Sequence, residues 1–158
     1  MAIQQTLVLI KPDAVQRGLV GNIISRFELK GLKLCALKLQ NITEATWEEH
    51  YSHIADKPFF PPMKDFMTST PIVCMVWQGK EAIEVVRLLA GETNSRKADV
   101  GTIRGDLSMS IQYNVVHASD SPEAAAEEIE RFFENGEVLD YHKSEYEHHL
   151  YTGDEKGE

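Results

Sequence analysis

Two periodicities alternate along the first 133 residues, and this alternation limits the possible folds more than any other feature. Short apolar runs such as "TLVLI" have the length of buried strands, and "KPD" ends that run because proline lacks a backbone donor. Apolar residues at helical spacing, such as Ile23, Ile24 and Phe27, indicate helices between the runs. The expected strands are residues 6–10, 32–39, 71–77 and a run ending at His117, and the expected helices are residues 20–30, 81–90 and 122–133.

The order of these elements is strand, helix, strand, insertion, strand, helix, strand. A doubled βαβ order of this kind is typical of the ferredoxin-like α+β fold, in which a four-stranded antiparallel sheet carries two helices on one face. The chain has 158 residues and 42% hydrophobic content, which suits one core. We therefore expect a single domain over residues 1–158, with a C-terminal extension from about residue 140.

Two segments exceed what the doubled βαβ order needs. Residues 43–70 contain a helical piece with Trp47 and Tyr51 and then the breaker-rich "DKPFFPPMKDFM", which predicts an inserted hairpin of short helices. Residues 91–112, "GETNSRKADVGTIRGDLSMSIQ", are polar and show almost no periodicity. A connection of this length in a compact domain usually has a function.

Composition restricts the partners and the location. The formal net charge of -9 disfavours nucleic acid as a primary partner and disfavours acidic membrane surfaces. The N-terminal "MAIQQTLVLIKPD" lacks the basic start and apolar length of a signal peptide, and no apolar stretch approaches the ~18 residues of a membrane span. We expect a cytoplasmic protein in which Cys35 and Cys74 are reduced thiols in the core.

The stretch "NVVHASDS" ends the last strand with a histidine. Ser121 followed by Pro122 has the pattern of a helix start, and the simplest interpretation is that the turn only caps a helix. On the helix that follows, however, Glu128 lies closest to the inward face and could reach back to the imidazole of His117. Ser119 could orient the same imidazole from the turn. The sequence leaves open which ring nitrogen would stay free.

Three basic residues lie at positions where the predicted fold does not require a positive charge. Lys11 closes the first strand, Arg87 flanks the inward face of its helix, and Arg104 lies inside "GTIRGD". Each has an ordinary structural explanation, but together with an oriented histidine in an acidic protein they indicate an anion site, with phosphate as the natural ligand. The glycine-rich phosphate loops with G-x-x-x-x-G-K-[ST] or G-x-G-x-x-G spacing are absent from the sequence, so side chains would have to hold the phosphates.

At this point the sequence resembles a known family, the nucleoside diphosphate kinases. The segments "TLVLIKPDAVQRGLVGNIISRFELKGLKL", "HY", "DKPFF", "GTIRGD" and "NVVHASDS" followed by Glu128 resemble that family in order, from residue 6 to about residue 141. The resemblance implies transfer of the terminal phosphoryl group from a nucleoside triphosphate to a nucleoside diphosphate. It further implies a ping-pong mechanism through a phosphohistidine, with Mg²⁺ as cofactor.

The resemblance also assigns roles to individual residues. It implies that His117 is the nucleophile, that Glu128 and Ser119 orient it, and that Asn114 contacts the sugar and phosphate region. Mg²⁺ would be held mainly through the nucleotide phosphates, without a dedicated set of protein ligands, and the subunits would form a homo-oligomer, a hexamer in preference to a tetramer. The residues implied to surround the phosphates are Lys11, Tyr51, Arg87, Thr93 and Arg104, of which Lys11 is also counted as catalytic, and Phe59 would stack on the base.

The sequence departs from the family pattern at three places. Ala118 stands where the family usually has glycine, which raises the question of whether the turn after His117 is shifted. Ser95 and Val100 stand where prolines are common, and their replacement of proline would make the long loop and its subunit contacts less rigid. Two alternatives remain at this point: a nucleotide-binding pseudoenzyme without turnover, and a regulatory ferredoxin-like binding module.

Overall fold

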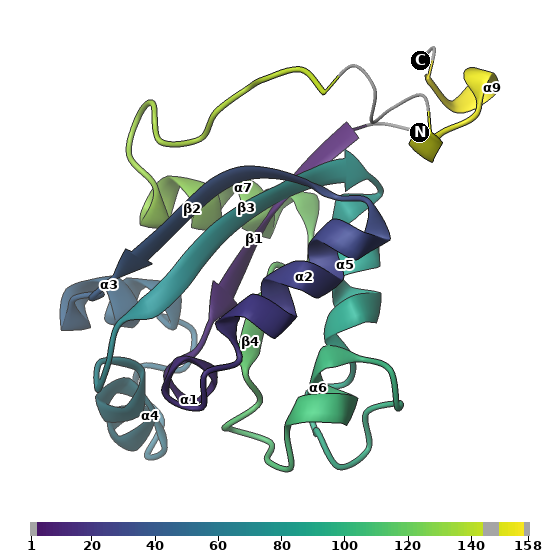
Figure 1. Cartoon of the computed structure of the whole chain (residues 1–158). Helices are drawn as coiled ribbons and strands as arrows, with labels where there is room; N and C mark the ends of the chain where they lie inside the picture. Colours follow the sequence, from purple (N-terminus) through teal and green to yellow (C-terminus); the bar gives the residue numbers. More distant parts are fainter. Residues whose placement is uncertain (1–2, 144–148, 157–158) are drawn as a thin grey trace.

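The computed structural model describes residues 3–143 and 149–156 and contains one antiparallel sheet. Its strands are β1 (Ile3–Ile10), β2 (Lys33–Gln40), β3 (Ile72–Lys80) and β4 (Val116–Ala118), in the order β2-β3-β1-β4 (Figure 1). This order is that of the ferredoxin-like fold, so the predicted fold class is confirmed. β1 is central, because it pairs with β3 along its whole length and with β4 at its end.

Helices cover both faces of this sheet, which corrects the expectation that helices cover one face only. On one face, α2 (Val20–Lys30) and α5 (Ala82–Ala90) pack on Val8 and Ile10. On the other face, α3 (Glu44–His50), α4 (Phe60–Met67) and α7 (Pro122–Phe132) pack on Leu7 and Leu9. Figure 1 shows α2 and α7 on opposite sides of the sheet. The inserted helical hairpin, α3 and α4, and the helix α7 therefore complete a second core on this face.

The continuous run of apolar residues in β1 is explained by the helices that cover both faces of the sheet. Side chains alternate between the two faces of a strand, so a strand covered on both faces needs apolar residues at successive positions. Leu7, Val8, Leu9 and Ile10 are all fully buried. The predicted core thiols of Cys35 and Cys74 are also buried and free.

The apolar periodicity of the sequence did not predict the short helices α1 (Pro12–Gln16) and α6 (Ile103–Leu107). The helix α1 begins with its proline at the first position, and α6 lies inside the long loop. Both have five residues, too few for an apolar repeat to be recognised. The start of α6 nevertheless follows from its residue type, because threonine is a common N-cap residue and the Thr102 hydroxyl accepts a hydrogen bond from the Gly105 N–H.

The C-terminal extension follows the outer edge of β2. The Leu139 N–H donates to the Cys35 carbonyl over 2.9 Å, and Lys33 donates to the carbonyl of Tyr141 over 2.7 Å. A last short helix, α9 (Gly153–Lys156), follows. Residues 144–148 and 157–158 of the predicted extension lie outside the described residues. Of the helices that are described, none has the length and apolar character needed to cross a membrane.

The first core should depend strongly on Phe27, whose ring centroid lies 5.3 Å from that of the buried Trp77. We expect Phe27→Ala to lower the free energy of unfolding by about 3–5 kcal/mol, because it leaves a cavity between α2 and the sheet. Glu28→Ala on the exposed side of the same helix should change it by less than ~0.5 kcal/mol. Denaturant unfolding of both variants checks this, and equal effects would contradict the packing.

Candidate active site

A cavity of about 690 Å³ opens at the end of β1 and β4. Its wall combines residues from α3, α5, α7, the long loop and the two strand ends, so it brings together segments far apart in the sequence. Most of the predicted site residues meet there. Those lining the cavity are Lys11, Tyr51, Arg87, Thr93, Arg104, Asn114, His117 and Glu128.

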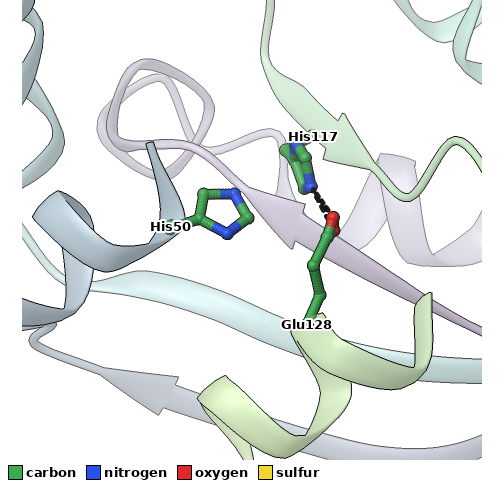
Figure 2. Close-up of side chains that lie close together, drawn as sticks. All are labelled: His50, His117 and Glu128. Carbon is green, nitrogen blue, oxygen red and sulfur yellow. Dashed lines mark hydrogen bonds and ion pairs between the residues drawn. The ribbon is translucent and has the colours of Figure 1, made fainter. Parts of the chain in front are cut away.

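His117 is held by the carboxylate of Glu128. Its Nε2 lies 3.0 Å from both Oε1 and Oε2 of Glu128. Figure 2 shows the imidazole facing this carboxylate. The helix start predicted for α7 makes this contact possible, since the Ser121 hydroxyl caps the helix and accepts from the Ala124 N–H. Ser119 was predicted to orient the imidazole directly, but its hydroxyl donates to Glu128 Oε2 over 3.2 Å. Ser119 therefore steadies the carboxylate.

This geometry determines the tautomer of His117. An ionised carboxylate only accepts hydrogen bonds, so Nε2 carries the proton and Nδ1 keeps its lone pair. Burial alone would raise the pKa of Glu128, but the hydrogen bond with His117, and the positive charge of that ring whenever it is protonated, outweigh it and hold that pKa below its usual value. The carboxylate therefore stays ionised, and Nδ1 is the free nucleophilic nitrogen.

His50, which sequence reasoning missed, lies beside this pair. Its ring centroid is 4.7 Å from that of His117, edge to face (Figure 2). Arg131 Nη1 lies 2.9 Å from His50 Nδ1. Burial, followed by the neighbouring His117, lowers the pKa of His50 to about 3. One indication of His50 was present in the sequence, its position next to Tyr51 on the inward side of a predicted helix. That position is equally typical of an ordinary core residue.

His50, His117 and Glu128 are close enough to raise the question of a metal site, with one ligand atom from each within 4.8 Å of the others. The contacts argue against it. Arg131 donates to the Nδ1 of His50, and His117 and Ser119 both donate to the carboxylate. Metal binding would have to break these bonds, so the cluster is built for hydrogen bonding.

Lys11 reaches the cavity from the end of β1. Its Nζ donates to the Gln112 carbonyl over 2.7 Å and to Asn114 Oδ1 over 2.9 Å. Burial is the main reason why its pKa falls to about 8; Asp13 opposes the shift and Arg104 adds to it. Lys11 is thus a cation held at a cost in solvation, which favours an anionic partner.

Arg104 has a larger structural part than the sequence suggested. Its guanidinium donates to the carbonyls of Gly91, Asn114 and Val116, over 2.8, 3.2 and 2.8 Å. Burial, with a contribution from Arg87, lowers the pKa of Arg104 to about 10, so the group remains charged near neutral pH. Arg104 therefore joins the end of α5, the segment before β4 and β4 itself in addition to facing the cavity.

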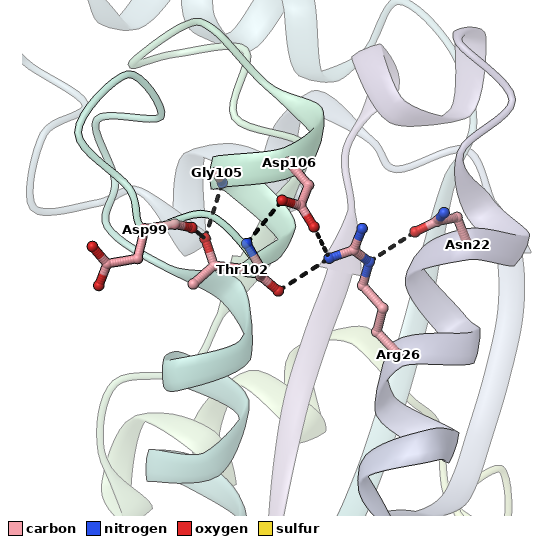
Figure 3. A network of polar contacts seen from close by, with 7 residues as sticks. Asn22, Arg26, Asp99, Thr102, Gly105 and Asp106 are labelled. Atoms are coloured by element: carbon pink, nitrogen blue, oxygen red, sulfur yellow. Dashed lines mark hydrogen bonds and ion pairs between the residues drawn. The ribbon is translucent and has the colours of Figure 1, made fainter.

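The helix that carries Arg104 is anchored from outside the cavity. Figure 3 shows Arg26 of α2 beside Asp106, and the two side chains are bonded over 2.8 Å. The other carboxylate oxygen of Asp106 accepts a hydrogen bond from the Gly101 N–H over 2.8 Å. A Cβ at position 105 would lie 1.9 Å from the Asp99 carbonyl oxygen, so this close approach requires Gly105. These contacts hold the loop in the absence of prolines.

The two loop positions that depart from the family pattern differ in their surroundings. Ser95 is buried, and its N–H donates to the Ser110 carbonyl over 3.3 Å, a bond that proline could not make. Val100 is 92% exposed. Ala118, the third departure, pairs with Val8 in the sheet and is not among the non-glycine residues with positive φ, Glu81 and Val115. In the described chain, alanine thus brings no left-handed strain after His117.

Val115 marks a strained turn that the sequence did not reveal. Its φ of 64° is uncommon for a β-branched residue, and the Val116 N–H donates to the Asn114 carbonyl over 2.8 Å across it. The turn is held because the Val115 N–H donates to Asp13 and the Lys11 N–H donates to the Val115 carbonyl. It aligns the Asn114 and Val116 carbonyls toward Arg104.

The remaining predicted residues have mixed surroundings. The ring of Tyr51 stacks on Trp47 at 5.9 Å, and burial is the main cause that raises the pKa of Tyr51 to about 12, so its hydroxyl stays protonated. The side-chain amide of Asn114 donates to the Thr93 and Ile111 carbonyls. Phe59 is 55% exposed and lies outside the cavity lining, whereas the adjacent Phe60 is buried.

Comparison with known proteins agrees with this arrangement. Residues 4–138 match the family model for nucleoside diphosphate kinase. A nucleoside diphosphate kinase of Parabacteroides distasonis is 54% identical over 87% of this chain and 90% of its own, and one of Methanosarcina barkeri is 56% identical over 87% and 93%.

Solved structures give the same result. A halophilic nucleoside diphosphate kinase of Halobacterium salinarum in complex with CDP has a TM-score of 0.91 at 40% identity, with 96% of this chain and 100% of that chain covered. A nucleoside diphosphate kinase family protein of Babesia bovis has a TM-score of 0.90 at 42% identity, with coverages of 94% and 99%. Sequence, fold and cavity together show that the chain belongs to the nucleoside diphosphate kinase family.

Proposed function

We propose that the chain transfers the terminal phosphoryl group from a nucleoside triphosphate to a nucleoside diphosphate through a phosphohistidine at Nδ1 of His117. Membership of the family makes the chain a nucleotide phosphotransferase. The observation that carries the proposed intermediate is the contact of both Glu128 oxygens with His117 Nε2 at 3.0 Å. It leaves Nδ1 as the nucleophile at the wall of the cavity.

The chemistry divides into two displacements. In the first, the Nδ1 lone pair forms a bond to the terminal phosphorus, and the bond to the bridging oxygen breaks, so that the diphosphate leaves with the electron pair. In the second, a terminal oxygen of another diphosphate attacks the phosphorus, and the electron pair of the P–N bond returns to Nδ1. Glu128 stabilises the positive charge that the ring gains while it carries the phosphoryl group.

The cations provide the electrostatic part of the reaction. Lys11, Arg87 and Arg104 line the cavity, whose wall also contains carboxylates such as Glu92, Asp120 and Glu127. Phosphoryl transfer depends mainly on positioning and charge neutralisation, which the three cations supply. Thr93, Tyr51 and Asn114 add polar groups around the phosphates, and the exposed Phe59 is suited to stack on a base.

Magnesium is the proposed cofactor, and the donor groups fit a loosely held ion. The cavity offers carboxylates without a closed cage of oxygen ligands among the described residues, which suits Mg²⁺ bound through nucleotide phosphates and water. Asp120 lines the cavity and would offer an oxygen acceptor near such an ion. The ion would neutralise phosphate charge during transfer.

The proposal extends to assembly and location. We propose a cytoplasmic homo-hexamer, following the resemblance of the long loop to that of the family. Exposed apolar side chains support subunit contacts: Val100, Met109 and Ile111 of the loop are 92%, 75% and 52% exposed. A nucleotide-binding pseudoenzyme or a regulatory module would retain the cavity but would not form a phosphorylated intermediate.

The intermediate gives the first test. Incubation with γ-labelled ATP should label the protein in an acid-labile, base-stable form, and the initial-rate lines for the two nucleotides should be parallel. His117→Ala should abolish the label while nucleotide binding persists, and His142→Ala, at an exposed histidine, should keep it. Labelling of His117→Ala at the normal rate would contradict the assignment, and bound but untransferred nucleotide would favour the pseudoenzyme.

A second test concerns the carboxylate. Glu128→Gln keeps the shape of the side chain but removes the charge that supports the imidazole, so we expect the turnover rate to fall on the order of 10²-fold. Glu130→Gln on the exposed side of the same helix should leave the rate unchanged. Steady-state kinetics with thermal unfolding as a folding check decides this. Equal rates for the two variants would mean that Glu128 has no part in the reaction.

Assembly is tested by light scattering on the purified protein. A mass near six times the 17.9 kDa of the chain is expected if the loop contacts form a hexamer. A mass near four times this value would indicate a tetramer in place of a hexamer. A monomer would show that the exposed apolar loop residues are not subunit contacts.

A further inference from the structure

The proposal concerns Arg131 and His50, two residues to which the resemblance assigns no role. Arg131 comes from α7, one turn after Glu128, and its side chain is 15% exposed. Besides its contact with His50, its Nε lies 3.5 Å from Glu49 Oε1. Both residues line the same cavity as His117.

The contact between them determines the state of His50. A guanidinium can only donate hydrogen bonds, so the Nδ1 of His50, 2.9 Å from Arg131 Nη1, must accept. The single proton of the neutral ring is then on Nε2. A second proton would have to enter at Nδ1, where the N–H would point at the N–H of Arg131.

We propose that Arg131 is a positioning residue for phosphoryl transfer, because it keeps His50 neutral and thereby leaves the carboxylate of Glu128 to His117. This inference rests on the proposed role of His117 as nucleophile. A protonated His50 would be a second cation beside the carboxylate and would compete with His117 for it. It would also repel the positive charge that the His117 ring gains in the intermediate.

Packing around His50 makes this competition unavoidable if the ring becomes charged. The ring is edge to face with His117 at 4.7 Å and with Phe132 at 5.1 Å, so it has no room to turn away toward water. Burial first, and then His117, Arg131 and His53, lower the pKa of His50 to about 3, whereas Glu128 raises it. The titratable and charged groups around the ring are Glu128 and Arg131 of α7, His117 of β4, Tyr51 and His53 after α3, and Glu49 of α3, which pairs with Arg131.

Removal of the guanidinium should therefore change the pH dependence. In Arg131→Met, Nδ1 of His50 is free to take a proton, and Glu128 favours the charged ring. Burial and His117 still lower the pKa of His50 in this variant, so that pKa stays below the ordinary histidine value of ~6.5. Loss of Arg131 should nevertheless move the acid limb of kcat/KM, which reports groups of the free enzyme, to higher pH. Hydrogen–deuterium exchange at C2 of His50, followed by mass spectrometry, measures the same titration without activity.

Three further variants separate this effect from general damage. Arg131→Met combined with His50→Phe has no second histidine to protonate, so its acid limb should return to the wild-type position. Arg131→Lys keeps a donor for Nδ1 and should also keep the wild-type limb. Lys30→Met removes an exposed cation at the end of α2 and should not move the limb. Thermal unfolding of each variant reports folding.

The outcomes are distinct. An unchanged acid limb in folded Arg131→Met, or a shifted limb that persists in the double variant, overturns the proposal. If Arg131→Met does not fold, C2 exchange in Arg131→Lys decides: His50 must remain neutral well below pH 6, and an ordinary titration overturns the inference. Absence of phosphate label on His117 in the wild-type protein would instead reject the proposed function itself.

Discussion

The pairing of β1 with β4 is the constraint on which the site depends. It places Leu9 opposite His117, so the strand that ends at Lys11 and the strand that carries the histidine run side by side in the sheet. Because the end of β1 is buried on both faces and paired with a strand on each side, it is a rigid platform for both residues. The strand β4 has only three residues. The strained turn at Val115 connects it to the segment that Arg104 contacts.

Two poorly solvated cations in the cavity favour an anionic ligand. Lys11 and Arg104 give up solvation to reach their places, and backbone carbonyls and Asn114 replace part of the lost hydration. Their pKa values are lowered to about 8 and about 10, because these contacts do not fully replace the lost hydration of the charged groups. An anionic ligand would offset this loss. Arg104 also joins three segments, so truncation of its side chain would remove its structural contacts together with its proposed contact to phosphate.

Local patterns were sufficient for most of the fold. The apolar runs identified all four strands, and the helical periods identified α2, α5 and α7, because each pattern spans at least one buried face. The five-residue helices α1 and α6 were missed because they are too short to show a period. The coverage of the second sheet face was also missed: the insertion was predicted as a hairpin of short helices, and only the structure shows that Trp47 and Met67 belong to the same core as Leu9.

The sequence by itself determined the order of elements, the acidic surface and the residue types available for phosphate chemistry, since these follow from local spacing and composition. It also placed Glu128 on the inward side of its helix. Only the tertiary structure decided which nitrogen of His117 is free, that Ser119 serves the carboxylate, and that His50 is neutral. The reason is physical: each of these depends on a hydrogen bond between segments, and the bond from Arg131 to His50 joins residues 81 positions apart. Such a bond leaves no trace in the periodicity of either segment.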